Sequence, residues 1–209
     1  WAGWFDTCAG RLIQVVGDDG QVEAVAFSPD GRLVAISSGN SVRIWDVASG
    51  KPLSDQLPHS RRVNVAFSHD GTLLATVPPD AGPQLWETAT GKACTDQLPS
   101  LDHVSALTFS PDGSLLAVSS GSDVWLGDLV SGEYFAKPLR HGGDVGLCLS
   151  FSRDGKLLAT SNRSGELGVA RLWRIHHETR SVQPVGRPAA HDREIVAVAF
   201  NEAGTLLAT

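Results

Sequence analysis

One short turn recurs along the chain at nearly constant spacing. It reads Phe-Ser-Pro-Asp-Gly or a close variant, and the last copy is the degenerate Phe-Asn-Glu-Ala-Gly. Steps of 40, 42, 42 and 49 residues separate the closing glycines, which are Gly31, Gly71, Gly113, Gly155 and Gly204. Glycine readily adopts the positive φ angle that closes such a hairpin, so we predict positive φ at all five. A fixed period of this length is typical of a repeat architecture.

Each period contains further segments of strand character. The turn lies between two apolar runs, and a break rich in Gly, Ser, Asn or Pro leads to a third run, such as residues 42–45, that usually ends in Trp. A second turn, as at residues 49–51, precedes a fourth run such as residues 52–57. Four short runs per period without helical periodicity predict an all-β chain. Pro138 and Pro188 lie in fourth runs, which predicts that these runs are edge strands.

Composition narrows the classes of function. The chain has 209 residues, of which 42% are hydrophobic and 19% charged, as in globular proteins. Its formal net charge is −6 and it has no Lys/Arg-rich block, which disfavours broad binding to nucleic acid or to anionic membranes. No apolar run is long enough to span a membrane, and no signal-peptide pattern opens the chain.

The cysteines indicate a reducing location. Cys8, Cys94 and Cys148 are odd in number, have unrelated spacings and form no CxxC pair. This pattern favours ordinary thiols in a cytoplasmic protein over a disulfide framework or a zinc site. The chain also starts at Trp1 and has no methionine, so we expect it to be a piece of a longer protein.

The chain resembles the WD-repeat β-propeller family. The resemblance rests on the repeated turns, the Trp45-Asp46 dipeptide with its variants, and the Ser-Gly-Lys turns, and the repeat sequences look like those of bacterial members. The resemblance covers nearly the whole chain. It implies four-stranded antiparallel blades arranged around a central channel. On this alignment one propeller domain occupies residues 1–209, with repeats starting near residues 22, 63, 104 and 145 and a partial one from residue 195.

The two ends of the chain read as two halves of one blade. Residues 5–11 align with residues 45–51, so the chain enters at a third strand and continues into a fourth strand at residues 12–16. It stops at Thr209, after a second strand. We therefore count about five blade equivalents. The ends could pair within one chain and share a blade, pair between chains, or belong to a larger propeller.

The resemblance also implies a buried hydrogen-bond chain in an intact repeat, formed by a histidine, a strand-two Ser or Thr, a third-strand Trp and an Asp. The second repeat has all four, at the positions His59, Thr76, Asp80 and Trp86. The fourth repeat has three of them, at His141, Thr160 and Trp173. Its connection between second and third strands is lengthened over residues 162–169, where Glu166 is the only candidate acid.

The remaining repeats keep less of this chain. Val118 and Gly127 stand at the Thr and Trp positions of the third repeat, which predicts that its chain is absent. In the first repeat Ile36 replaces the hydroxyl and only Trp45 remains. His191 and Thr209 begin a fifth set.

Two patterns could be mistaken for chemistry. A His–Asp–Ser/Thr set suits acyl transfer, but here it recurs at the repeat period and lacks a GxSxG elbow, which favours a structural role. His176 and His177, followed by Glu178, could touch a metal, yet adjacent strand residues face opposite ways, so we interpret them as a solvated, lengthened turn. No motif for a metal, phosphate or dinucleotide occurs, and we predict no cofactor.

We therefore expect a non-catalytic module that binds a protein or peptide, and no enzyme. In the family this resembles, partners meet one rim of loops, and bacterial arrays are often the sensor or scaffold part of a larger signalling protein. The candidate contacts on that rim are Arg61, Arg62, Asp80, Trp125, Arg163, Asp192 and Arg193. The alternative is a hydrolase or lyase propeller with polar groups at the channel, but the axis-facing positions are mostly Ala, Val and Leu.

Overall fold

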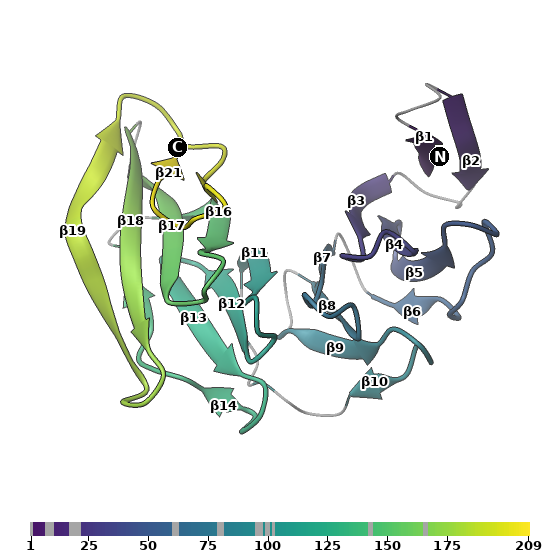
Figure 1. Ribbon diagram of the computed structural model, residues 1–209, viewed down its shortest axis with the longest axis horizontal. Helices are drawn as coiled ribbons and strands as arrows, with labels where there is room; N and C mark the ends of the chain where they lie inside the picture. Colours follow the sequence, from purple (N-terminus) through teal and green to yellow (C-terminus); the bar gives the residue numbers. More distant parts are fainter. Residues whose placement is uncertain are drawn as a thin grey trace. The chain divides into compact units, whose positions relative to one another are not determined.

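The computed structural model describes residues 2–6, 11–16, 22–59, 63–78, 82–94, 98, 101, 103–141, 144–164 and 167–209. All regular structure in these ranges is β, which confirms the predicted fold class (Figure 1). No helix in the described ranges is long and apolar enough to cross a membrane. The chain divides into two compact units: Trp1–Pro79 with Gln84–Thr95, and Asp80–Pro83 with Asp96–Thr209.

The first unit holds a hairpin and two antiparallel sheets. The hairpin pairs β1 (Ala2–Asp6) with β2 (Arg11–Val16). The first full sheet follows chain order in space: β3 (Val22–Phe27), β4 (Leu33–Ser38), β5 (Ser41–Asp46) and β6 (Leu57–Pro58). The second has the same order: β7 (Asn64–Phe67), β8 (Leu73–Val77), β9 (Gln84–Glu87) and β10 (Ala93–Cys94).

The second unit repeats this pattern. Its first sheet contains β11 (Val104–Phe109), β12 (Leu115–Ser120) and β13 (Asp123–Asp128), and two short strands pair with the outer edge of β13: β14 (Glu133–Tyr134) and β15 (Leu139–Arg140). The next sheet contains β16 (Asp144–Phe151), β17 (Leu157–Ser164), β18 (Leu167–His176) and β19 (Ser181–His191). A hairpin of β20 (Ala199–Phe200) and β21 (Leu207–Ala208) follows.

A set of side-chain hydrogen bonds closes the first hairpin of each full sheet. The Ser28 hydroxyl donates to Asp30 Oδ1 over 2.6 Å and accepts the Leu33 N–H over 2.9 Å. Asp30 Oδ1 also accepts the Arg32 N–H over 3.0 Å. The Ser28 hydroxyl and then the Arg32 N–H lower the pKa of Asp30 below its usual value. Gly31, with φ of 71°, lets the chain reverse between these partners.

The same turn is present in all four full sheets. The serine–aspartate bond and the leucine N–H bond recur with the same lengths at Ser68, Ser110 and Ser152. In the degenerate copy Asn201 Oδ1 alone accepts the N–H groups of Thr205 and Leu206, each over 2.8 Å. The predicted positive φ angles are confirmed at every closing glycine, with values of 71°, 72°, 71°, 69° and 67°.

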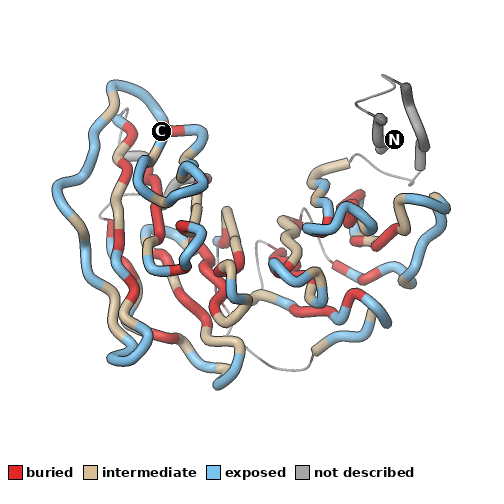
Figure 2. Tube along the Cα trace, in the orientation of Figure 1, coloured by how far each residue is buried: buried red, intermediate tan, exposed pale blue. Residues whose placement is uncertain are grey.

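The apolar core lies between neighbouring sheets. Figure 2 shows the buried positions concentrated on the second and third strands of the full sheets. In the first unit one cluster joins β4, β5 and β6 to the next sheet and consists of Ala35, Val42, Ile44, Leu57, Val63, Leu74 and Trp86. In the second unit the matching cluster consists of Leu115, Ala117, Val124, Leu126, Phe135, Leu139, Leu158, Trp173 and Ile175. Burying both faces of the inner strands stabilises the stack of sheets.

The fourth runs lie at the outer edges of the sheets, as their prolines predicted. In the first sheet the predicted run over residues 52–57 is not a continuous strand. Only β6 and an isolated bridge between Trp45 and Pro52 pair with β5. Pro52 has no N–H to donate, and the Ser54 hydroxyl accepts the Ile44 N–H over 3.2 Å in place of a backbone carbonyl.

One further expectation needs correction. In the fourth repeat, residues 162–164 and 167–169 do not belong to a lengthened loop, because they continue β17 and β18 as a ladder in which Ser164 lies opposite Leu167. Backbone groups in this extension are thereby paired with each other. The described strands of the fifth repeat are β20 and β21. Ahead of them Ile195 is buried, and its carbonyl accepts a hydrogen bond from Cys148 Sγ over 3.8 Å.

The terminal hairpins remain two-stranded. Among the described residues β1 pairs with β2 and β21 pairs with β20. Whether the two ends share a blade stays a prediction, since they belong to different units.

The closing glycines yield the first testable prediction. A Cβ added at Gly113 would meet no atom within 4 Å, so alanine there is opposed only by the φ of 71°. We expect Gly113→Ala to lower the free energy of unfolding by about 1–2 kcal/mol. Gly113→Asn should cost less, because asparagine populates this region more readily. Urea unfolding measures both variants, and equal losses for the two would contradict the assignment.

Candidate functional site

Three predicted residues of the fourth repeat form a buried hydrogen-bond chain. Trp173 Nε1 donates to Thr160 Oγ1 over 2.8 Å, and Thr160 Oγ1 lies 2.8 Å from His141 Nε2. Because Thr160 already accepts the indole N–H, we infer that its hydrogen is donated to Nε2 and that the imidazole proton is on Nδ1. No hydrogen-bond partner for Nδ1 is found among the described residues. Glu166, the candidate acid, lies outside them.

The second repeat shows the same arrangement in part. Trp86 Nε1 donates to Thr76 Oγ1 over 2.8 Å. The His59 ring meets the Trp86 ring edge-on, with centroids 5.9 Å apart. All three side chains are buried. Asp80, the fourth predicted member, lies outside the described residues.

The first and fifth repeats keep only parts of the hydrogen-bond chain. In the first repeat Trp45 Nε1 is buried and, within the described ranges, lacks a partner, because Ile36 stands where a hydroxyl would accept it. In the fifth repeat Thr209 Oγ1 lies 2.7 Å from His191 Nε2.

The third repeat fills its missing Trp position from elsewhere. A Cβ on Gly127 would lie 2.5 Å from both terminal methyl groups of Leu98, so Leu98 packs directly on the glycine backbone. Elsewhere in this sheet, the hydroxyls of Ser105 and Ser119 are 2.8 Å apart. No motif marked Leu98, because its role depends on the three-dimensional contact and not on its spacing.

These chains are suited to holding strands together and not to proton transfer at neutral pH. Burial lowers the pKa of His59 to about 4. Burial, and next the charge of Arg171, lowers the pKa of His141 to about 4 as well. Thr160 is fully buried and its oxygen is engaged by an indole N–H, so it offers no accessible nucleophile. Among the described residues no three His, Cys, Asp or Glu side chains are placed to hold a metal ion.

The loops at one end of the strands are tied together in pairs. The His59 N–H donates to the Asn40 carbonyl over 2.8 Å, and the His141 N–H donates to the Ser122 carbonyl over 3.3 Å. Gly121 N–H likewise donates to the His103 carbonyl over 3.3 Å. In these three cases a loop that leads into a first strand is bonded to a loop between second and third strands, the two kinds of loop from which the binding rim was predicted.

Two predicted rim residues lie beside a surface cavity in the second unit. Asp192 and Arg193 are exposed and line a cavity of about 440 Å³, together with His191 and Thr209. The Arg193 carbonyl would lie 2.4 Å from a Cβ on Gly168, so the crossover runs directly over the end of the β17–β18 hairpin. The chain direction at these exposed charges is therefore fixed by close packing.

The other predicted rim residues are placed differently. Trp125 is half-buried and packs against Tyr134, with ring centroids 4.7 Å apart and the rings tilted by 48°. Burial raises the pKa of Tyr134 to about 12. Trp125 is therefore largely engaged within its own sheet. The remaining side chains lie outside the described part of the chain; they are those of Arg61, Arg62, Asp80 and Arg163.

The turn after β18 is more than the solvated loop expected from its histidines. The His177 ring meets the edge of Phe135, with centroids 5.7 Å apart, and the Arg180 guanidinium lies 5.1 Å from the centre of the same ring. Arg180 also pairs with Asp128 at the end of β13. These contacts hold the turn against the preceding sheet.

Sequence comparison identifies a family profile and several known proteins to which the chain is similar. The profile described as WD domain, G-beta repeat matches residues 10–46, 94–124 and 136–174, more than half of the chain. Periodic tryptophan protein 2 of Saccharomyces cerevisiae is 25% identical over 167 residues, which cover 76% of this chain and 18% of that protein. Target of rapamycin complex subunit wat1 of Schizosaccharomyces pombe is 27% identical over 185 residues, covering 85% of this chain and 57% of that protein.

Human WD repeat-containing protein 36 is 43% identical over 61 residues, which cover 29% of this chain and 7% of that protein. The chain therefore spans less than two thirds of each of these three relatives.

The paired and unpaired indoles permit a matched comparison. Trp86→Phe removes an N–H that is bonded to Thr76, whereas Trp45→Phe removes one without a described partner. Both tryptophans are buried to a similar degree. We expect Trp86→Phe to lower the free energy of unfolding by about 1 kcal/mol more than Trp45→Phe. Urea titrations decide the matter, and a larger loss for Trp45→Phe would contradict the hydrogen-bond chain.

The buried histidines predict a pH dependence of stability. In the folded state His59 and His141 stay neutral down to a pKa of about 4, whereas in the unfolded chain they bind protons near the ordinary histidine pKa of 6.5. Protons therefore favour the unfolded state in this window, and stability is lost as pH falls from 6.5 towards 4. Each histidine contributes a slope of at most about 1.4 kcal/mol per pH unit.

Unfolding titrations between pH 6.5 and 5 should show His141→Gln with a shallower slope than the wild type. His69 is exposed, so His69→Gln is the matched control and should keep the wild-type slope. A wild-type slope in His141→Gln would show that this histidine is not held neutral.

Proposed function

Because the chain belongs to the WD-repeat family, we propose that it is a non-catalytic scaffold that binds a protein or peptide partner through its loop rim. The observation that carries this proposal is the pairing of loops by backbone bonds, as between His59 and Asn40. It places loops from successive repeats side by side on packed sheets. Binding residues are commonly presented on loops that a rigid scaffold positions.

The rim of the second unit has the chemistry of a protein interface. Asp192 and Arg193 supply opposite charges next to each other, and Val196 beside them is 78% exposed. Mixed polar groups around an apolar side chain suit a partner surface that offers both hydrogen bonds and apolar contact. The name of the relative wat1, a complex subunit, supports an assembly role.

In the described ranges, no observation favours the alternative hydrolase or lyase function. The His–Thr–Trp chains are buried, and the histidine pKa values near 4 oppose general base catalysis at neutral pH. We further propose that the chain is the sensor or scaffold part of a larger signalling protein in the cytoplasm. The free thiols of Cys94 and Cys148 are compatible with a reducing compartment.

A charge swap tests the rim. We expect Asp192→Arg combined with Arg193→Asp to weaken partner binding at least tenfold, with an unchanged melting temperature. The matched control swaps the exposed ion pair Arg153–Glu202, through Arg153→Glu and Glu202→Arg, and leaves the net charge unchanged too. Quantitative affinity capture measures how much of each binding partner is retained by the wild type, by the rim variant and by the control variant. A rim swap that retains every partner of the wild type would overturn the proposal.

A further inference from the structure

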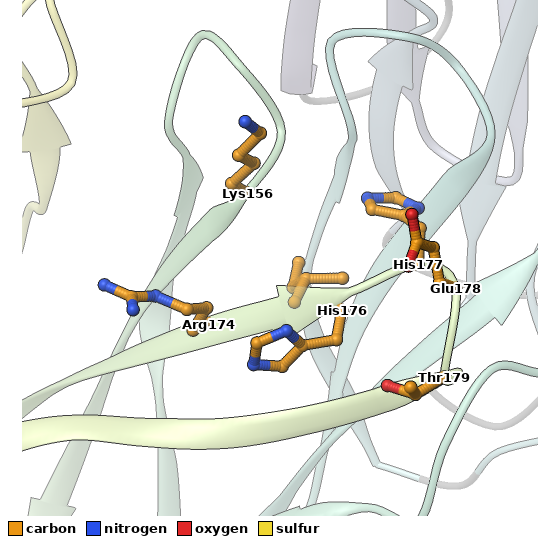
Figure 3. Close-up of a pocket in the computed structure, with 7 residues that line it drawn as sticks. Lys156, Arg174, His176, His177, Glu178 and Thr179 are labelled. Atoms are coloured by element: carbon orange, nitrogen blue, oxygen red, sulfur yellow. The ribbon is translucent and has the colours of Figure 1, made fainter.

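A basic depression lies at the opposite end of the fourth sheet from the rim loops. It has a volume of about 340 Å³. Lys156 lines it from the turn before β17, and Arg174 and His176 line it from the end of β18 (Figure 3). His177, Glu178 and Thr179 from the following turn complete its wall, and the buried Ile175 also contributes. This volume suits one or two side chains of a ligand.

One residue of the depression carries the opposite charge to its counterparts in the other sheets. The residues paired with the first leucine after each closing glycine are Asp46, Glu87, Asp128 and Arg174 in the four sheets. The aspartates cap the next turn: Asp46 accepts the Ser49 N–H over 2.7 Å, and Asp128 accepts the Val130 N–H over 2.9 Å. Arg174 cannot accept a backbone N–H, so at this position a guanidinium replaces a carboxylate that caps its turn.

The two permanent cations of the depression are available to a ligand. Among the described residues neither Lys156 nor Arg174 has a carboxylate oxygen within ion-pair distance. The Ser152 hydroxyl, then the Lys156 N–H and, more weakly, the charge of Lys156 lower the pKa of Asp154 in the same turn. The lining itself holds two permanent cations and one carboxylate, that of Glu178, on a chain whose formal net charge is −6.

The walls of the depression are held in place before any ligand arrives. The Ile175 N–H donates to the Lys156 carbonyl over 2.9 Å, which fixes the turn against β18. On the other side, the contacts of His177 and Arg180 with Phe135 fix the turn after β18. A site that is already ordered loses less conformational entropy on binding.

We infer that this depression binds an acidic segment of a protein, with Arg174 and Lys156 holding aspartate or glutamate carboxylates. A guanidinium pairs with a carboxylate through two parallel hydrogen bonds, and Lys156 adds a second positive charge. Glu178 at the wall and the negative net charge disfavour a polyanion such as nucleic acid. This site would be separate from the rim and would give the scaffold a second contact.

The test uses fluorescence anisotropy with a labelled eight-residue peptide rich in Asp and Glu. We expect saturable binding that weakens as salt is raised, and at least tenfold weaker binding when Asn and Gln replace the acids. Lys156→Glu combined with Arg174→Glu should weaken binding at least tenfold. The control Lys137→Glu with Arg187→Glu makes the same change of charge at exposed residues outside the depression and should stay within twofold of the wild type.

The milder variant Lys156→Gln with Arg174→Gln provides a check against misfolding and should also lose binding. The rim variant of Asp192 and Arg193 should bind the acidic peptide like the wild type, so failure of one site is distinguishable from failure of the other. Wild-type affinity in both depression variants would overturn the inference. Equal binding of the acidic and the amide peptide, or tighter binding of a single-stranded oligonucleotide at these residues, would overturn it too.

Discussion

The serine hydroxyl in the first hairpin of each sheet is the contact on which the rest of the structure depends. Ser28 bonds both Asp30 and the Leu33 N–H, so it fixes where the second strand begins relative to the first. In a strand, a shift of one residue moves every side chain to the other face. By setting this register at each repeat, the turn decides which residues enter the two faces of the core.

The buried histidines connect that core to the binding surface. The backbone of His141 belongs to a rim loop, where its N–H bonds Ser122, while its ring reaches Thr160 in the sheet. His59 has the same double position, with its N–H on Asn40 and its ring against Trp86. The loops that present the proposed interface are therefore positioned by buried side chains.

The sequence predicted features whose cause is local. The positive φ of Gly113 follows from its turn, and the bond between Trp86 and Thr76 is one that the resemblance to the WD-repeat family implied. It did not predict features that arise from contacts between distant segments. Leu98 fills the space above Gly127, and Arg180 packs on Phe135, because of shapes that exist only once the sheets are assembled. The extension of the β17–β18 ladder was likewise not predicted, because no short sequence motif indicates it.

Hydrogen exchange of the turn amides, observed by NMR, tests the central claim most directly. The relevant donors are the amides of Leu33, Leu73, Leu115 and Leu157, each bonded to a serine hydroxyl over 2.9 Å. If these bonds set the register of the sheets, the four amides should exchange as slowly as those in the strands that follow them. Exchange at the rate of solvent-exposed turns in all four repeats would contradict this account.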